Sequence, residues 1–139
     1  MRVSAYQWNE KQRVWMRADP AADGRPRKAV LSADVAALND PAPMDSRPDA
    51  SPARRAKALD QAIEHATLAG STIVQRSEWS AVLSKMRPIA HAVHLVACFL
   101  TAGLWILPYI YFLLSRRDER FRLEVDRWGH VWPSAPKRS

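Results

Sequence analysis

The strongest constraint in this chain is an apolar stretch over residues 88–115, which contains no Lys, Arg, Asp or Glu. Folded as one α-helix it would extend about 42 Å, whereas the hydrocarbon core of a bilayer is about 30 Å thick. A domain that buries such a helix on all sides needs more chain than the 139 residues present. The stretch therefore predicts a membrane helix, and it places the protein in the cell (inner or plasma) membrane.

The chain is basic, with 21 Lys and Arg against 14 Asp and Glu and a formal charge of +7. The charges are spread along the sequence, so a nucleic-acid partner is not expected. Beside a membrane segment, basic residues favour anionic lipid headgroups. The residues predicted to contact those headgroups flank the stretch and are Arg87, Arg116, Arg117, Arg120 and Arg122.

The rest of the chain divides into short segments. Ser51 and Pro52 are a helix start signal and Gly70 is a stop, while strict alternation from Phe121 to Val125 indicates a strand. The predicted segments are a small hairpin at 1–17, a disordered linker at 18–51, a helix plus strand pair at 52–87, the membrane segment at 88–115, and a basic β-hairpin tail at 116–139. The expected fold class is membrane-anchored α+β, with one soluble helix and short β-hairpins flanking a single apolar membrane helix.

An alternative arrangement of the stretch stays open. Gly103 and Pro108 could form the turn of a re-entrant hairpin with legs of about 12–14 residues, too short to cross the bilayer. Both flanking segments would then lie on one side, and their strands could join one sheet. The N-terminal region, which lacks the apolar core of a signal peptide, is expected in the cytoplasm. One kinked spanning helix is the commoner solution and is the leading prediction.

Polar and small residues within the stretch recur at steps of 3, 4, 3 and 4, so one helix would place them on one face. They are His91, His94, Cys98, Thr101 and Trp105. These five residues form a row that we call the seam. Rows of this kind usually pack against another membrane helix, which predicts a homo-oligomer formed through the membrane segment. The alternative is a Zn²⁺ or haem site on His91, His94 and Cys98. Because the segment holds no acidic partner for the histidines, no metal or cofactor is expected.

Sequence signatures of catalysis were not found. The chain shows no Ser/His/Asp arrangement, no paired carboxylates on one element and no CxxC, and its four glycines do not form a phosphate-binding loop. We expect that the protein is not an enzyme.

The run from His91 to Trp105, HAVHLVACFLTAGLW, resembles a group of small uncharacterised membrane proteins of actinobacteria and their phages. The resemblance extends over roughly 54–132 and includes the helix that ends at Gly70, the run Ala81-Val82-Leu83 and the segment 125–131. It implies a membrane protein of phage or prophage origin, with roles such as envelope modification or superinfection exclusion. Pro108 and the run Tyr109-Ile110-Tyr111 depart from the group's pattern.

The expected function is a non-enzymatic, membrane-anchored interaction protein that contacts lipid headgroups and an unknown protein partner. The alternatives are a metal- or haem-binding membrane protein and a holin-like pore former.

Overall fold

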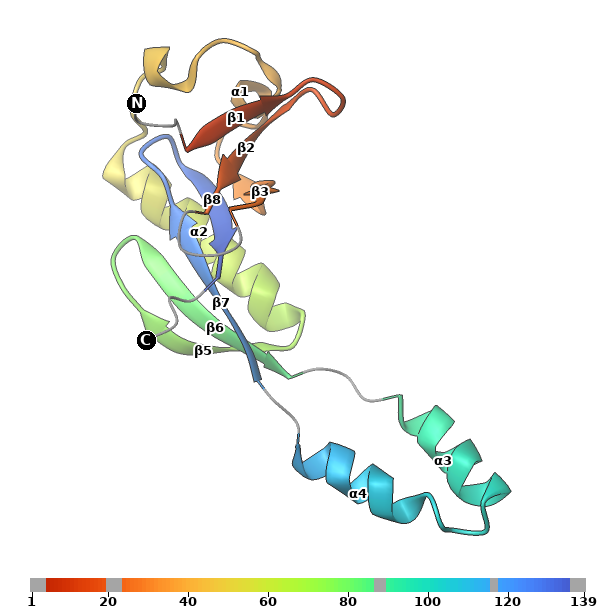
Figure 1. Cartoon of the computed structure of the whole chain (residues 1–139). Coiled ribbons are helices and arrows are strands. Elements are labelled where there is room, and N and C mark those ends of the chain that lie inside the picture. Colours follow the sequence, from red (N-terminus) through yellow and green to blue (C-terminus); the bar gives the residue numbers. More distant parts are fainter. Residues whose placement is uncertain (1–4, 20–23, 87–89, 116–117, 136–139) are drawn as a thin grey trace. The chain divides into compact units, whose positions relative to one another are not determined.

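The computed structural model describes residues 5–19, 24–86, 90–115 and 118–135 (Figure 1). Contacts within the chain divide it into two compact units. The first unit comprises Met1–Ser84 and Arg120–Ser139, and the second comprises Lys85–Glu119.

The first unit is built on a five-stranded sheet with the order β4-β8-β7-β6-β5. The strands are β4 (Leu31–Ser32), β8 (His130–Ser134), β7 (Asp118–Val125), β6 (Ser80–Met86) and β5 (Ser71–Arg76). β7 and β8 are antiparallel, with Val125 opposite Val131. The alternation in β7 sends Leu123 and Val125 into the core, because successive side chains of a strand point to opposite faces.

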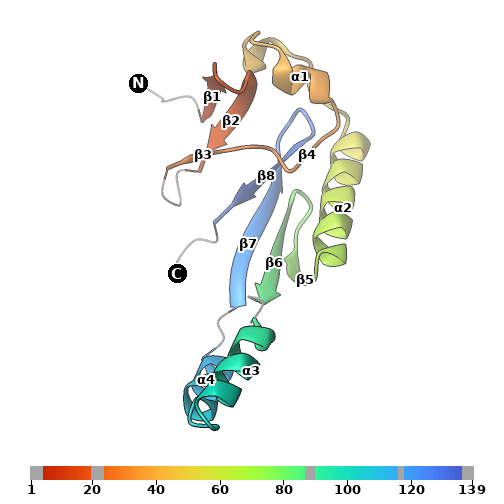
Figure 2. The same ribbon diagram turned by 90° about the vertical axis from the view of Figure 1, so that its right-hand side faces the viewer.

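Helix α2 (Pro52–Leu68) covers one face of this sheet (Figure 2). It begins where Ser51 accepts a hydrogen bond from the backbone N–H of Arg54, and the chain leaves it through Gly70 at φ 88°. Its buried residues are Ala58, Leu59, Ala62 and Ile63, and they pack with Leu83, Leu123 and Val131 of the sheet. Each such large side chain contributes about 1.5–3 kcal/mol by leaving water.

A second, smaller sheet has the order β1-β2-β3, from β1 (Tyr6–Asn9), β2 (Val14–Ala18) and β3 (Pro26–Arg27). Tyr6, Val14 and Trp15 of this sheet pack on a cluster that includes Trp128 and Trp132. The N-terminal strands are therefore part of the first unit's fold.

The expectation of a disordered linker at 18–51 is corrected for its described part. That part holds β3, β4, helix α1 (Val35–Asn39) and the 3-10 turn η1 (Met44–Ser46). Its apolar side chains are few, but Leu38 and Met44 are both buried beside the tryptophans. The segment is ordered because the large rings of Trp128, in the β7–β8 turn, and Trp132, in β8, supply the apolar surface that its own sequence lacks.

The prediction of a single membrane helix is wrong, and with it the expected fold class. The stretch forms two short helices, α3 (His91–Leu100) and α4 (Ile106–Leu114). In the described parts of the chain, no helix combines the length and apolarity needed to cross a bilayer. The chain breaks at Ala102 and Gly103, which both have positive φ, 51° and 89°.

The strands on either side of the stretch are also not separate hairpins. β6 precedes it and β7 follows it, and the two are neighbours in the five-stranded sheet. The fold is α+β with two sheets, and the predicted C-terminal tail supplies two inner strands of the larger one.

Candidate functional site

Residues 90–115 of the second unit form a helical hairpin, which we call the apolar hairpin. Its turn is closed by Gly103 N–H, which donates to the Cys98 carbonyl at 2.8 Å, and by the Thr101 hydroxyl, which donates to the Ala97 carbonyl at 2.7 Å. Pro108 lies in the first turn of α4, where its missing N–H costs no helical hydrogen bond. The turn therefore depends on the glycine, which adopts a positive φ without strain.

The seam predicted on one helix face is divided between two helices. His91, His94 and Cys98 lie on α3, whereas Trp105 follows the turn as the N-cap of α4. Trp105 nevertheless returns to the seam, because its Nε1 donates to His94 Nδ1 at 3.1 Å and its backbone N–H donates to the Thr101 hydroxyl at 3.2 Å. The structure thus brings three of the five predicted residues into contact.

Sequence reasoning missed two side chains of α4 that complete this contact. The Tyr109 hydroxyl lies 2.9 Å from His91 Nδ1, and its ring centroid is 5.1 Å from that of His94. The Phe112 ring lies 5.9 Å from His94 on the same side. Their spacing from Trp105, near one helical turn apart, would have placed them on one face of a helix that starts after Gly103.

The predicted ligand set is not assembled as a metal site. Nδ1 of each histidine is occupied within the hairpin, by Tyr109 or by Trp105. Across the described parts of the chain, no three His, Cys, Asp or Glu side chains are grouped so that they could hold a metal ion.

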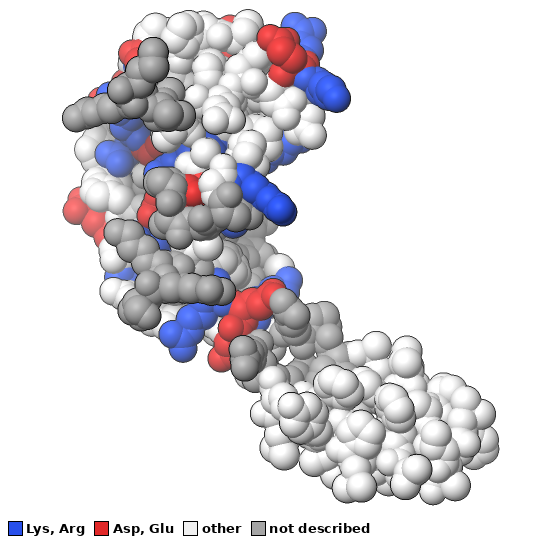
Figure 3. All heavy atoms as spheres, in the orientation of Figure 1, with Lys and Arg blue, Asp and Glu red and all other residues white. Residues whose placement is uncertain are grey.

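Almost all of the apolar surface of the hairpin is open. Neither α3 nor α4 contains a buried residue. Figure 3 shows the apolar hairpin as a surface without the blue and red that mark charged side chains elsewhere in the chain. The large apolar side chains exposed here are Val93, Leu95, Val96, Phe99, Leu100, Leu104, Trp105, Ile106, Leu107, Ile110, Tyr111, Phe112 and Leu114.

The basic residues predicted at the headgroups have different surroundings. Arg120 is exposed, and Arg87, Arg116 and Arg117 lie outside the described residues. Arg122 instead donates to the Ser80 hydroxyl at 3.0 Å and lies 3.1 Å from Glu124, so its guanidinium is held on the sheet.

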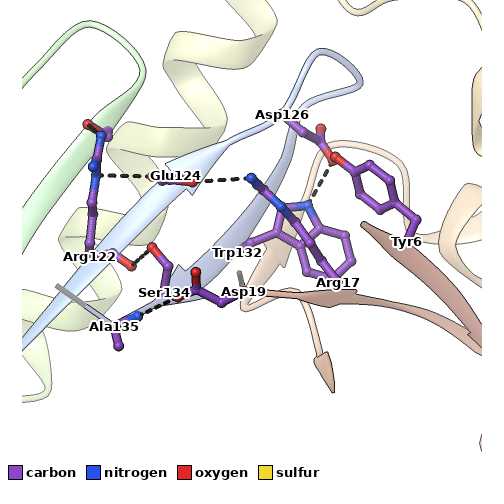
Figure 4. A network of polar contacts seen from close by, with 10 residues as sticks. Tyr6, Arg17, Asp19, Arg122, Glu124, Asp126, Trp132, Ser134 and Ala135 are labelled. Carbon is purple, nitrogen blue, oxygen red and sulfur yellow. Dashed lines mark hydrogen bonds and ion pairs between the residues drawn. The ribbon is translucent and has the colours of Figure 1, made fainter. Parts of the chain in front are cut away.

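A second polar cluster lies in the first unit, around the buried carboxylate of Asp126 (Figure 4). Its Oδ1 accepts from the backbone N–H groups of Trp128 and His130 at 3.0 and 2.9 Å. Its Oδ2 accepts from Trp132 Nε1 at 2.8 Å and from the Tyr6 hydroxyl at 3.5 Å. Burial, and then the charge of Asp126, raise the pKa of Tyr6. This cluster fixes the β7–β8 turn and ties β1 to it.

An open hollow of about 510 Å³ lies beside this cluster, lined by charged side chains that pair with one another. Arg17 of β2 and Arg122 of β7 both contact the Glu124 carboxylate, at 3.3 and 3.1 Å. Figure 4 shows Glu124 between the two guanidinium groups. The Arg17–Glu124 pair joins the small sheet to the large one, whereas Arg122 and Glu124 both belong to β7, so these pairs have a structural role.

His130 is fully buried between β4 and the turn. Its Nδ1 lies 2.5 Å from the Ser32 hydroxyl. Burial lowers the pKa of His130 and the Arg47 guanidinium acts in the same direction, while Asp126 and Asp34 oppose them. The imidazole is accordingly neutral near pH 7.

Comparison with known proteins gives no relative: no family model, no curated protein and no solved structure matches the chain. The resemblance to actinobacterial and phage membrane proteins stays a prediction, and the comparisons give no support for a phage or actinobacterial origin.

Proposed function

We propose that this protein is a non-enzymatic anchor that inserts the apolar hairpin into one leaflet of a lipid bilayer and presents its α+β unit to a protein partner. The observation that carries this proposal is the all-round exposure of apolar side chains on both helices. Surfaces of this kind are unfavourable in water, and each large side chain gains about 1.5–3 kcal/mol on full transfer to an apolar medium.

The dimensions of the hairpin suit one leaflet. The ten residues of α3 extend about 15 Å, which is half of the roughly 30 Å hydrocarbon core. The segments that enter and leave the hairpin continue from β6 and β7, which are neighbouring strands. The chain can therefore enter and leave on one side, and no polar segment has to cross.

The polar groups of the hairpin are also suited to hydrocarbon. His91 pairs with Tyr109, His94 with the Trp105 indole, and the Thr101 hydroxyl with a carbonyl of its own helix. An unpaired polar group costs several kcal/mol in lipid, where water cannot satisfy it. These internal pairs reduce that cost.

Lipid is favoured over a protein groove as the occupant because of how the exposure is distributed. A groove covers one stripe of a helix and leaves the other side in water, so bound helices are usually amphipathic. Here Val93 and Leu95, two residues apart and so on nearly opposite sides of α3, are 65% and 66% exposed. On α4, Leu107 and Phe112 also point in different directions and are 72% and 50% exposed, and no charge interrupts the surface.

The headgroups that suit this anchor are anionic. Five basic residues lie within five positions of the apolar stretch, against the two acidic residues Asp118 and Glu119. Each Lys or Arg near an anionic surface contributes about 1 kcal/mol. The five are Lys85, Arg87, Arg116, Arg117 and Arg120.

Vesicle flotation of the full chain tests the anchor. We expect co-flotation with phosphatidylcholine vesicles that contain phosphatidylserine, and weaker binding without phosphatidylserine or in high salt. The double variant Phe99→Glu, Leu104→Glu should lose at least tenfold in partitioning. The matched control is Leu68→Glu, which changes a side chain of similar exposure, 79%, on α2. Equal binding by the double variant would overturn the proposal, and release of vesicle contents would indicate a pore.

Labelling tests whether the chain stays on one side. In a Cys98→Ser background, single cysteines replace Ser51 before the hairpin and Asp118 after it, both of which are exposed. Protein added to preformed vesicles should react at both positions with an impermeant maleimide outside. Protection of only one position would show that the chain crosses.

A further inference from the structure

The outer strand of the large sheet, β5, has only one strand beside it. In the order β4-β8-β7-β6-β5 its neighbour is β6, and Figure 1 shows it at the end of the sheet. Along its other edge, the described parts of the chain place no further strand. Such an edge presents backbone N–H and C=O groups in the pattern that another strand needs.

The side chains of β5 are also exposed to solvent. Five of its six residues, from Thr72 to Arg76, are exposed. Ile73 and Val74 are 50% and 49% exposed, and because they are consecutive they point to opposite faces of the sheet. Apolar surface is therefore open on both faces at the centre of this strand.

Natural edge strands usually carry charges or proline that prevent pairing. Residues 71–75 of β5 include neither. The one charged residue, Arg76, lies at the end of the strand and is paired with Asp60 of α2. The edge thus lacks the usual protection, and it is rich in the β-branched residues that favour strand pairing.

We propose that β5 pairs antiparallel with β5 of a second copy of this chain, so that two five-stranded sheets join across a twofold axis. With the axis between the two copies of Ile73, Ile73 lies opposite Ile73 of the other copy. Thr72 then lies opposite Val74, and Ser71 opposite Gln75. β-Branched residues face one another at the centre, polar residues face each other toward the ends, and no like charges meet.

This self-complementary register favours a second copy over an unrelated extended peptide, whose sequence would have to supply the same pattern. The proposal goes beyond the membrane anchor and does not need it. Anchoring would strengthen the pairing by raising the local concentration of the chain.

The first test measures the mass of the full chain in detergent micelles by light scattering. We expect a dimer, and at least a tenfold weaker dimer for Val74→Lys, because a lysine on an edge strand opposes pairing and the two ammonium groups would be diagonal neighbours on one face. The control is Val30→Lys, at a side chain of similar exposure, 54%, outside the β5 edge. A monomeric wild-type chain, or an unchanged dimer of Val74→Lys, would overturn the proposal.

A second test separates this contact from association through the hairpin. The double variant Phe99→Glu, Leu104→Glu should remain a dimer, whatever it does on vesicles. If it becomes a monomer while Val74→Lys stays a dimer, the copies meet through the hairpin and the β5 proposal fails.

A crosslinking test fixes the register. In the Cys98→Ser background, chains with Thr72→Cys are mixed with chains that carry Val74→Cys and a tag of different mass. The mixed disulfide should exceed either homodimeric disulfide severalfold, since these positions lie directly opposite each other. Crosslinking no greater than that of Val30→Cys would overturn the pairing, and homodimers in excess would exclude this register.

Discussion

The indole Nε1 of Trp105 donates a hydrogen bond to Nδ1 of His94 across the turn that separates α3 from α4. An indole nitrogen can only donate, so His94 Nδ1 must be the acceptor and its ring is held in one tautomer. The two residues were predicted on one face of a single helix. They meet because the chain folds back on itself after Gly103.

Trp105→Phe should weaken the hairpin while keeping most of its apolar surface. The change leaves His94 Nδ1 without its donor in an apolar environment, which costs about 1–3 kcal/mol. We expect faster amide hydrogen exchange in α3 of vesicle-bound protein. The control is Tyr111→Phe, at an exposed side chain of α4; faster exchange in both variants alike would contradict the role of this bond.

Gly103→Ala should loosen the turn through backbone strain alone. A Cβ at this position would meet only Ile106 Cδ1 at 3.7 Å, an ordinary contact, but φ is 89°. A left-handed conformation costs a non-glycine residue roughly 1–2 kcal/mol. Limited proteolysis should cut the hairpin faster in this variant. Gly24→Ala, also at positive φ but in the first unit, should leave that cleavage unchanged.

Asp126→Asn should destabilise the first unit. The amide has one acceptor oxygen for the four donors that now share the carboxylate, and its NH₂ would face some of them. The expected cost is about 2 kcal/mol or more, a fall in Tm of at least roughly 8 °C by thermal unfolding. Tyr6→Phe removes only the longest of these bonds and should cost less. A larger fall in Tm for Tyr6→Phe than for Asp126→Asn would contradict the central role of the Asp126 carboxylate.

Acid should destabilise the first unit through His130. Its pKa is lowered in the folded state, mainly by burial, so below the ordinary value of about 6.5 the unfolded chain binds a proton that the folded chain does not. Stability is therefore full above about pH 6.5 and falls as the pH drops below it. Thermal unfolding between pH 5 and 7.5 should show this slope, and His130→Gln should flatten it. An unchanged slope would assign the effect to other groups.

Local signals located several elements well. The Ser51-Pro52 start and the Gly70 stop delimit α2, because capping and backbone freedom act within a few residues. The alternation of Phe121, Leu123 and Val125 marked a strand for the same reason. The His91, His94 and Trp105 spacing also pointed to residues that do meet, although by a different geometry.

Long-range packing decided the elements that local signals missed. Leu38 and Met44 lie in a segment with too few large apolar residues to form a core of its own. They are buried because they pack with Trp128 and Trp132 from the far end of the chain. The four donors of Asp126 likewise come from both ends.

The sequence by itself determined that residues 88–115 are apolar throughout, that basic residues flank them, and where α2 begins and ends, since these depend on composition and neighbouring residues. Only the tertiary structure decided that the stretch is a hairpin of two short helices. A glycine can continue a helix or break it, and the choice depends on whether the strands before and after it pair. Here β6 and β7 do pair, so the strand before the stretch and the strand after it lie side by side in one sheet.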